Sequence, residues 1–173
     1  MEVVKAPDNS REELLTHWVE CHQKRLLNLC YMVLQDRELA RDAVQETFLK
    51  AYKAMSTFRG DSNELTWLTR IALNICRSMK RSAWARHEKR DVTPEDIVRT
   101  ATNGFNQNAI DLANAILQLP DKYKEVVMLY YFQRMTMEDI AHVEGTTKSL
   151  ISRRIHKAHA LLHDILGKEY LYG

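Results

Sequence analysis

Apolar residues recur along most of this chain at three- and four-residue steps, the spacing that places them on one face of an α-helix. One such stripe lies between Thr66 and Arg90 and consists of Leu68, Ile71, Ala72, Ile75 and Met79. The same spacing predicts a helix from Ser10 to Leu34 and another from Asp36 to Met55. The core positions of that second helix are Ala40, Val44, Phe48, Ala51 and Met55. The segment from Ser56 to Glu64 holds a glycine and small polar residues, which predicts a loop.

The second half of the chain shows the same periodicity in shorter segments. It predicts a helix from Ile110 to Leu119 that Pro120 stops, followed by a buried helix from Tyr123 to Phe132 whose tyrosines belong to the core. Two capping patterns, Ser10–Glu13 and Thr136–Asp139, predict helix starts, because a hydroxyl and a carboxylate three residues later can satisfy the free amides there.

A helix-turn-helix is predicted near the end of the chain. Ala141 is small enough for two helices to cross, Gly145 can adopt the positive φ of the turn, and Ile151 packs the second helix back. Thr147 is placed to cap this second helix, whereas Glu144 occupies a turn position where an apolar residue is usual. The predicted inward residues are Ile151, Ile155, Ala158, Leu162 and Ile165. The predicted outward residues, facing a major groove, are Lys148, Ser149, Ser152, Arg153, His156 and Lys157.

The composition indicates an all-α protein. The 173 residues include only five glycines and three prolines, with many strong helix formers. Residues 100–108 are polar and lack periodicity, which predicts a flexible linker. We therefore expect two small helical domains, residues 1–92 and residues 109–173, joined by a linker over residues 93–108, with the helix-turn-helix in the second.

Charge is segregated along the chain, although the net charge is only +2. Residues 66–90 carry seven Lys and Arg against one acid, and residues 146–173 carry a net +3, whereas the remaining segments are acidic. Aromatic residues lie beside the first basic block, namely Phe58, Trp67 and Trp84. Positive charge for phosphates and flat rings for bases are typical of single-strand nucleic-acid binding, and a solvated charged face is the alternative.

The cysteines and histidines do not form a recognisable site in the sequence. Cys21, Cys30 and Cys76 form no CxxC pair and are predicted to be buried thiols in a reducing compartment. His22 is predicted to be a satisfied core histidine. His156, His159 and His163 share a helix face, so metal binding there stays open as an alternative, but no cofactor is expected. Because no apolar run reaches about 18 residues and no signal-peptide core is present, a cytoplasmic protein without membrane insertion is predicted.

Four motifs in order resemble the extracytoplasmic-function sigma factors of bacterial RNA polymerase. They are Asp42–Leu49 (DAVQETFL), Phe58–Ser62 (FRGDS), Trp67–Asn74 (WLTRIALN), and Leu119–Pro120 followed by the helix-turn-helix. The resemblance covers about residues 10–166. It implies an alternative sigma factor that binds core RNA polymerase and directs promoter recognition, DNA melting and transcription initiation, without being an enzyme.

The resemblance also implies roles for individual residues. The surface that docks on the clamp helices of the polymerase would consist of Asp42, Gln45, Glu46, Leu49 and Lys53. The melted single strand of the minus-10 element would be held by Phe58, Arg59, Ser62, Asn63, Trp67, Asn74, Arg77, Lys80 and Arg81. The duplex minus-35 element would be read by the outward face of the helix-turn-helix, from Lys148 to Lys157. An anti-sigma partner is a further expectation from the family.

Two other classes of protein remain as alternatives. A stand-alone helix-turn-helix transcription regulator would use only the second domain, and it would leave the face from Asp42 to Lys53 without a role. An enzyme such as a metal-dependent nuclease would need carboxylates or His and Cys ligands on converging elements, which the sequence does not offer. The promoter sequence, the inducing signal and the identity of an anti-sigma factor are not encoded in any pattern of the chain.

Overall fold

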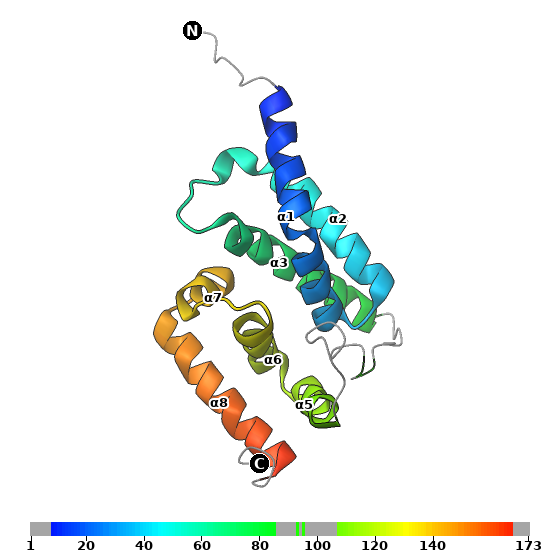
Figure 1. Ribbon diagram of the computed structural model, residues 1–173, viewed down its shortest axis with the longest axis vertical. Helices are drawn as coiled ribbons and strands as arrows, with labels where there is room; N and C mark the ends of the chain where they lie inside the picture. Colours follow the sequence, from blue (N-terminus) through cyan, green and yellow to red (C-terminus); the bar gives the residue numbers. More distant parts are fainter. Residues whose placement is uncertain (1–7, 86–92, 94, 96–106, 168–173) are drawn as a thin grey trace. The chain divides into compact units, whose positions relative to one another are not determined.

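The computed structural model describes residues 8–85, residues 93 and 95, and residues 107–167. The chain divides into two compact units, residues 1–88 and residues 89–173. Within the described ranges both units consist of helices joined by short turns and loops, and no strand occurs among those residues. The all-α prediction is therefore confirmed (Figure 1). The linker prediction falls mostly on residues outside the described ranges.

The first unit is built from three long helices that pack against one another. They are α1 (Asp8–Leu34), α2 (Arg37–Lys53) and α3 (Glu64–Ala85), and α1 and α2 lie side by side in Figure 1. Their shared core includes the fully buried side chains of Trp18, Leu26, Leu29, Leu68 and Leu73. The predicted stripe of α2, from Ala40 to Met55, is buried at all five positions. Burial of apolar area at this periodicity stabilises the three-helix packing.

Local signals set most of the helix boundaries in this unit. Asp36 caps α2, since its Oδ1 accepts a hydrogen bond of 2.8 Å from the amide of Leu39. The positive φ of Gln35 turns the chain between α1 and α2. The capping box predicted at Ser10 is wrong, because α1 already begins at Asp8 and Ser10 lies inside it.

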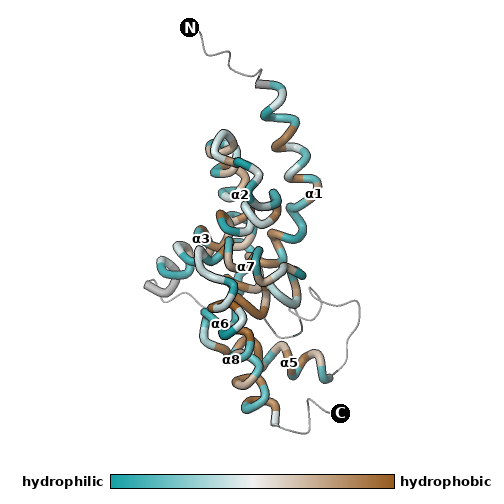
Figure 2. Tube along the Cα trace, turned by 90° about the vertical axis from the view of Figure 1, so that its left-hand side faces the viewer, coloured by the Kyte–Doolittle hydropathy of each residue, from teal (hydrophilic) through white to brown (hydrophobic). Residues whose placement is uncertain are grey.

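In the described part of the second unit, four α-helices and one π-helical turn pack together. These are α5 (Gln107–Gln118), α6 (Asp121–Val127), the π-helical turn η2 (Met128–Phe132), α7 (Met137–Glu144) and α8 (Lys148–Leu166). Pro120 separates α5 from α6, as predicted. The helices α6 and α8 are in contact with each other. Teal and brown stretches alternate along α5 in Figure 2, as expected for an amphipathic helix.

The turn between α7 and α8 has the geometry that the sequence predicts. Thr136 and Asp139 form a reciprocal capping box at the start of α7. Gly145 takes the left-handed conformation, with φ of 64°, where a side chain would be strained. The hydroxyl of Thr147 caps α8 by accepting from the amide of Leu150 at 3.3 Å. The helix-turn-helix is thus held by its own local hydrogen bonds.

Three predictions of burial are wrong. Ile165 lies in the last turn of α8, one residue before the helix ends, and is 41% exposed. Tyr131 is 49% exposed. The π-helical turn from Met128 to Phe132 shifts the helical spacing, so the Tyr131 ring no longer falls on the buried face. Cys21 is exposed as well, whereas Cys30 and Cys76 are buried as expected.

Candidate functional site

The outer face of α2 carries the predicted docking residues on one exposed side. Asp42, Gln45 and Lys53 are exposed, and Leu49 is 58% exposed, a high value for a leucine in a unit with a well-formed core. The carboxylate of Glu46 pairs with Lys50 Nζ at 2.9 Å along the same helix. An exposed leucine surrounded by charged and polar groups is a typical contact point for a protein partner.

An open groove of about 830 Å³ lies beside this face, between α1 and α2. Its lining residues are Glu12, Leu15, Val19, Gln23, Leu27, Arg41, Asp42, Val44, Gln45, Phe48, Leu49 and Tyr52. The guanidinium of Arg11 donates to the carbonyl oxygen of Tyr52 at 2.7 Å and lies 4.8 Å from the centre of the Tyr52 ring. The groove joins α1 residues to the predicted face. No local pattern in the sequence indicates this groove, because the residues of α1 and α2 that line it meet only in the folded unit.

The outer face of α3 forms a basic stripe, as predicted. Asn74 and Arg81 are exposed, and Arg77 and Lys80 are half-buried, while Leu68, Ala72 and Ile75 on the opposite side are buried. Arg70 extends the same exposed stripe toward the start of the helix. The rest of the basic block, from Arg86 to Arg90, lies outside the described residues. The stripe presents positive charge at the spacing of successive helix turns.

The loop before α3 is anchored at both of its ends. The ring of Phe58 packs against Trp18 and Trp67, with centroids 5.8 Å and 5.2 Å away. At the other end, Asn63 caps α3, because its Oδ1 accepts from the amide of Thr66 at 2.8 Å. Arg59 is exposed between these anchors. Two of the three aromatic residues noted beside the basic block, Phe58 and Trp67, therefore come together, and they form a cluster with Trp18 of α1.

A carboxylate fixes the position of this cluster, and no local pattern in the sequence points to it. Glu64 Oε2 accepts from the indole Nε1 of Trp18 at 2.8 Å, and Oε1 lies 2.6 Å from His22 Nε2 and 3.6 Å from His17 Nε2. Partial burial acts to raise the pKa of Glu64, but the hydrogen bonds from His22 and Trp18 outweigh it and lower that pKa. His22 is thus a satisfied histidine, as predicted. Its partner lies 42 residues away, beyond the reach of a local pattern.

The outward face of α8 is arranged as predicted. The side chains of Lys148, Ser149, Arg153, His156 and Lys157 are exposed and that of Ser152 is half-buried, opposite the buried stripe from Ile151 to Leu162. Two members of this face also have intramolecular partners. Lys148 Nζ lies 3.5 Å from Glu138 Oε1 on α7, and His156 Nδ1 bonds the carbonyl oxygen of Ser152 at 2.8 Å.

An ion pair explains the unusual residue in the turn. Glu144, where an apolar residue is usual, lies 3.5 Å from Arg154 Nη1, and both side chains are largely buried. Arg154 therefore points away from the outward face and pins α8 to the end of α7. A buried carboxylate without this partner would carry a large desolvation penalty.

The three histidines of α8 have separate partners. His159 Nε2 lies 2.5 Å from the hydroxyl of Tyr131, and His163 Nδ1 lies 4.0 Å from Asp164 Oδ1. Partial burial, followed by the neighbouring Tyr130, raises the pKa of Tyr131. Across the described ranges, no three His, Cys, Asp or Glu side chains are grouped so as to hold a metal ion. Nor is any helix in those ranges long and apolar enough to cross a membrane.

Each of the two units matches a known protein family, and the whole chain is similar to known proteins. The model of Sigma-70 region 2 matches residues 18–86, and that of Sigma-70 region 4 matches residues 109–170. The RNA polymerase sigma-H factor of Pseudomonas aeruginosa is 31% identical over 150 residues, covering 79% of this chain and 78% of that protein. The sigma factor SigV of Bacillus subtilis is 26% identical, covering 91% of this chain and 94% of that protein.

Solved structures share the fold. A structure of CnrH in complex with the cytosolic domain of CnrY matches with a TM-score of 0.69 at 24% identity, covering 90% of this chain and 88% of that one. The sigma factor RpoE of Bartonella quintana, crystallised with the anti-sigma factor NepR, matches with a TM-score of 0.66 at 23% identity, covering 91% and 96%. Together with the sequence matches to both regions, these findings show that the chain belongs to the extracytoplasmic-function group of sigma factors.

Proposed function

We propose that this sigma factor divides its task among three surfaces of the described structure. The outer face of α2 docks on core RNA polymerase, the Phe58 loop and α3 hold melted promoter DNA, and α8 reads duplex DNA. The observation that carries the proposal is the outer face of α2, where Leu49 is exposed beside an apolar groove. A DNA-binding domain acting alone would have no use for such a face.

The docking surface consists of Asp42, Gln45, Glu46, Leu49 and Lys53. Leu49 would supply a desolvated apolar anchor, and the polar groups around it would fix the orientation of the partner. Because Glu46 is already paired with Lys50, its carboxylate is held in one direction rather than sampling many. The groove beside Leu49 offers room for an apolar side chain of the partner.

The strand-holding surface combines stacking and charge. The residues are Phe58, Arg59, Ser62, Asn63, Trp67, Asn74, Arg77, Lys80 and Arg81. Extruding a base costs a few kcal/mol, and stacking on an aromatic ring returns about 1–3 kcal/mol. Since Asn63 Oδ1 caps α3, its amide nitrogen is the group that would contact a base. The basic stripe of α3 would then follow the phosphates of the same strand.

The duplex-reading surface is the exposed side of α8. Lys148, Ser149, Ser152, Arg153, His156 and Lys157 would meet the major groove of the minus-35 element, with Arg153 pairing to a guanine edge. The two DNA-binding surfaces are fixed on one polymerase, which raises the effective concentration of each surface near its DNA element. Neither surface must therefore bind tightly alone. The polymerase supplies the chemistry, and the sigma factor itself catalyses no reaction and works in the cytoplasm beside it.

An anti-sigma factor is the proposed regulator of this chain. Two similar structures are complexes, one of CnrH with the cytosolic domain of CnrY and one of the sigma factor RpoE with the anti-sigma factor NepR. A partner of this kind would act by covering one of the three surfaces, and the groove beside Leu49 offers it an apolar opening in the first unit.

A titration of the labelled protein with core RNA polymerase tests the docking surface. Glu46→Lys should weaken binding at least tenfold, because it reverses a charge inside the interface and removes the pairing with Lys50. The matched control is Glu38→Lys, which reverses an exposed charge at the other end of the same helix. Equal affinities of the Glu46 and Glu38 variants would remove this face from the proposal.

The strand-holding role has its own test. Asn74→Ala should impair open-complex formation while leaving duplex binding by α8 unchanged, since Asn74 lies on the exposed stripe of α3. Comparing pre-melted and fully duplex templates separates the two steps. The assignment fails if the losses on the two templates are equal.

A further inference from the structure

Glu64 occupies the junction between the loop and α3. It is the first residue of α3, and both of its carboxylate oxygens are engaged by side chains of α1. Trp18, which donates its indole N–H to Oε2, is completely buried. His22, which meets Oε1, is largely buried as well. A buried indole N–H needs an acceptor, so Glu64 fixes where the Trp18 ring can lie.

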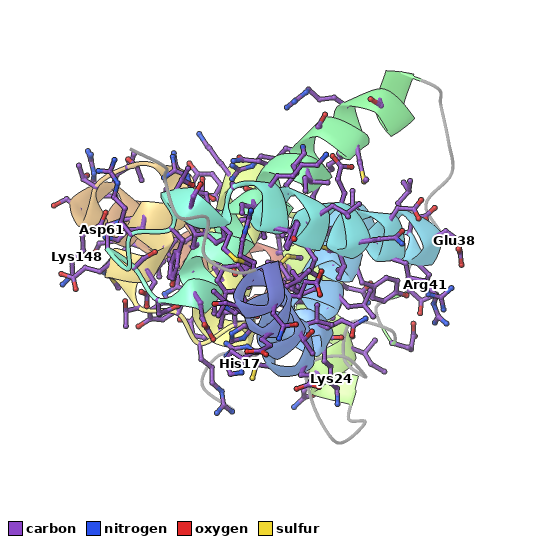
Figure 3. The ribbon with its side chains drawn as sticks, turned by 90° about the horizontal axis from the view of Figure 1, so that it is seen from above. His17, Lys24, Glu38, Arg41, Asp61 and Lys148 are labelled. Carbon is purple, nitrogen blue, oxygen red and sulfur yellow. The ribbon has the colours of Figure 1, made fainter. Side chains whose placement is uncertain are left out.

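The Trp18 ring is in turn the surface on which the loop is anchored. Trp18, Phe58 and Trp67 are mutually in contact, with ring centroids 5.2 to 5.8 Å apart. At the far end of the loop, Asn63 caps the helix that Glu64 begins. Only the stretch from Arg59 to Ser62 lies between these two anchors, with Gly60 at φ of 76° and Asp61 exposed at the tip (Figure 3).

We propose that Glu64 is a positioning residue for base capture: by holding Trp18, it sets the Phe58 loop in the conformation that receives an unpaired base. This inference rests on the proposed strand-holding function. A loop that is already ordered loses less conformational entropy on binding than one that must be ordered by the DNA. Glu64 itself need not touch the DNA, because it acts through the aromatic cluster.

Four variants distinguish this positioning role from an effect of the Glu64 charge and from a general loss of stability. Glu64→Leu removes the acceptor for Trp18, and Trp18→Phe removes the donor while keeping an aromatic ring. Glu64→Gln removes the charge but keeps a carbonyl acceptor for Trp18. That distinction matters because loss of a carboxylate near DNA would by itself strengthen phosphate binding. Glu38→Gln is the control, an exposed carboxylate paired with Arg41 near the start of α2 (Figure 3).

Limited trypsin digestion of the free protein reports the state of the loop. Cleavage after Arg59, in the loop, is compared by mass spectrometry with cleavage after Arg134, an exposed residue before α7 in the second unit. We expect Glu64→Leu and Trp18→Phe to raise the ratio of Arg59 to Arg134 cleavage about fivefold, the factor for loss of one hydrogen bond. Glu64→Gln and Glu38→Gln should stay near the wild-type ratio. An unchanged ratio in Glu64→Leu would overturn the positioning role.

Open-complex formation by the holoenzyme tests base capture itself. On a promoter selected by the wild-type holoenzyme, single abasic substitutions along the melted strand identify the position whose base is captured. Glu64→Leu should reduce open-complex formation about fivefold on the intact promoter but not on the promoter abasic at that position, because the captured base is then absent. An equal loss on both promoters would mean a general structural defect and would overturn the inference.

The outcomes also separate this inference from the proposed function. If the wild-type protein binds no core polymerase, the proposed function fails and this inference fails with it. If the wild-type protein forms open complexes and shows a captured position, but Glu64→Leu behaves like Glu38→Gln, only the positioning role is wrong.

Discussion

The two proposed DNA surfaces of this sigma factor are held in place by different kinds of contact. The outward face of α8 belongs to one continuous helix, which the hydroxyl of Thr147 caps and whose opposite stripe is buried. The Phe58 loop has one local support, the cap that Asn63 gives to α3, but its other end depends on Trp18 of α1, more than 35 positions earlier in the chain. A surface for regular duplex can therefore be local, whereas a pocket for a single base is built by tertiary contacts.

Removal of Trp18 should have the largest effect, because it takes away the tertiary contact on which the Phe58 loop depends. Trp18→Ala deletes the ring on which Phe58 and Trp67 pack and leaves a cavity in the core of the first unit, so that unit should lose about 3–5 kcal/mol of unfolding free energy. The second unit should be unaffected, since its core is its own. Hydrogen exchange followed separately for residues 8–85 and 107–167 checks this. Equal loss of protection in both ranges would show that the two units do not unfold independently.

Removal of Arg153 should affect only the surface on α8. Arg153 is exposed and its helix is held by other residues, so Arg153→Ala should cost about 1–3 kcal/mol of minus-35 discrimination with no change in stability. Binding to the promoter duplex and to a scrambled duplex is measured at one salt concentration. If both affinities fall by the same factor, Arg153 contacts phosphate only. Arg154→Ala is the contrasting variant, because its pairing with Glu144 predicts loss of stability instead.

The same contrast explains how far the sequence could predict the molecule. Helical periodicity and capping patterns were sufficient for the stripe of α2, the capping box at Thr136 and the outward face of α8, because each depends on residues within one or two turns. They failed at Cys21 and Ile165, whose exposure depends on what packs beside the helix. Burial at those positions is decided by neighbouring elements, and periodicity carries no information about where those elements end.

The missed contacts in the candidate site have the same origin. Glu64 was predicted as the last residue of a loop, whereas it is the first residue of α3, and nothing near it in sequence indicates Trp18 or His22 as partners. Arg154 sits one residue after Arg153, yet it points inward to Glu144. Adjacent arginines on a helix differ by about 100° in direction, so their roles could be separated only after the packing partner of the helix was known.

Acidification should weaken the first unit through Glu64. Because the folded-state pKa of Glu64 is lowered, its ionised form stabilises the fold above its ordinary value of 4.5, and this contribution is lost as the pH falls through the folded-state pKa. The unfolding free energy of Glu64→Gln should therefore decline less steeply below pH 4.5 than that of the wild type. Chemical denaturation at several pH values measures the two slopes. Parallel slopes would mean that the carboxylate is not stabilised by His22 and Trp18.

Loss of the exposed pair between Lys148 and Glu138 should have the smallest effect. The two side chains are 61% and 72% exposed and 3.5 Å apart, so the pair contributes about 0–1 kcal/mol to stability. Glu138→Gln should leave the unfolding free energy unchanged and raise duplex affinity no more than about threefold, since a carboxylate beside the phosphates is removed. Asp164→Asn, an equally exposed change near the end of α8, is the control. A fall in duplex affinity would show instead that Glu138 directs Lys148 toward the DNA, and the surface on α8 would then also depend on a neighbouring helix.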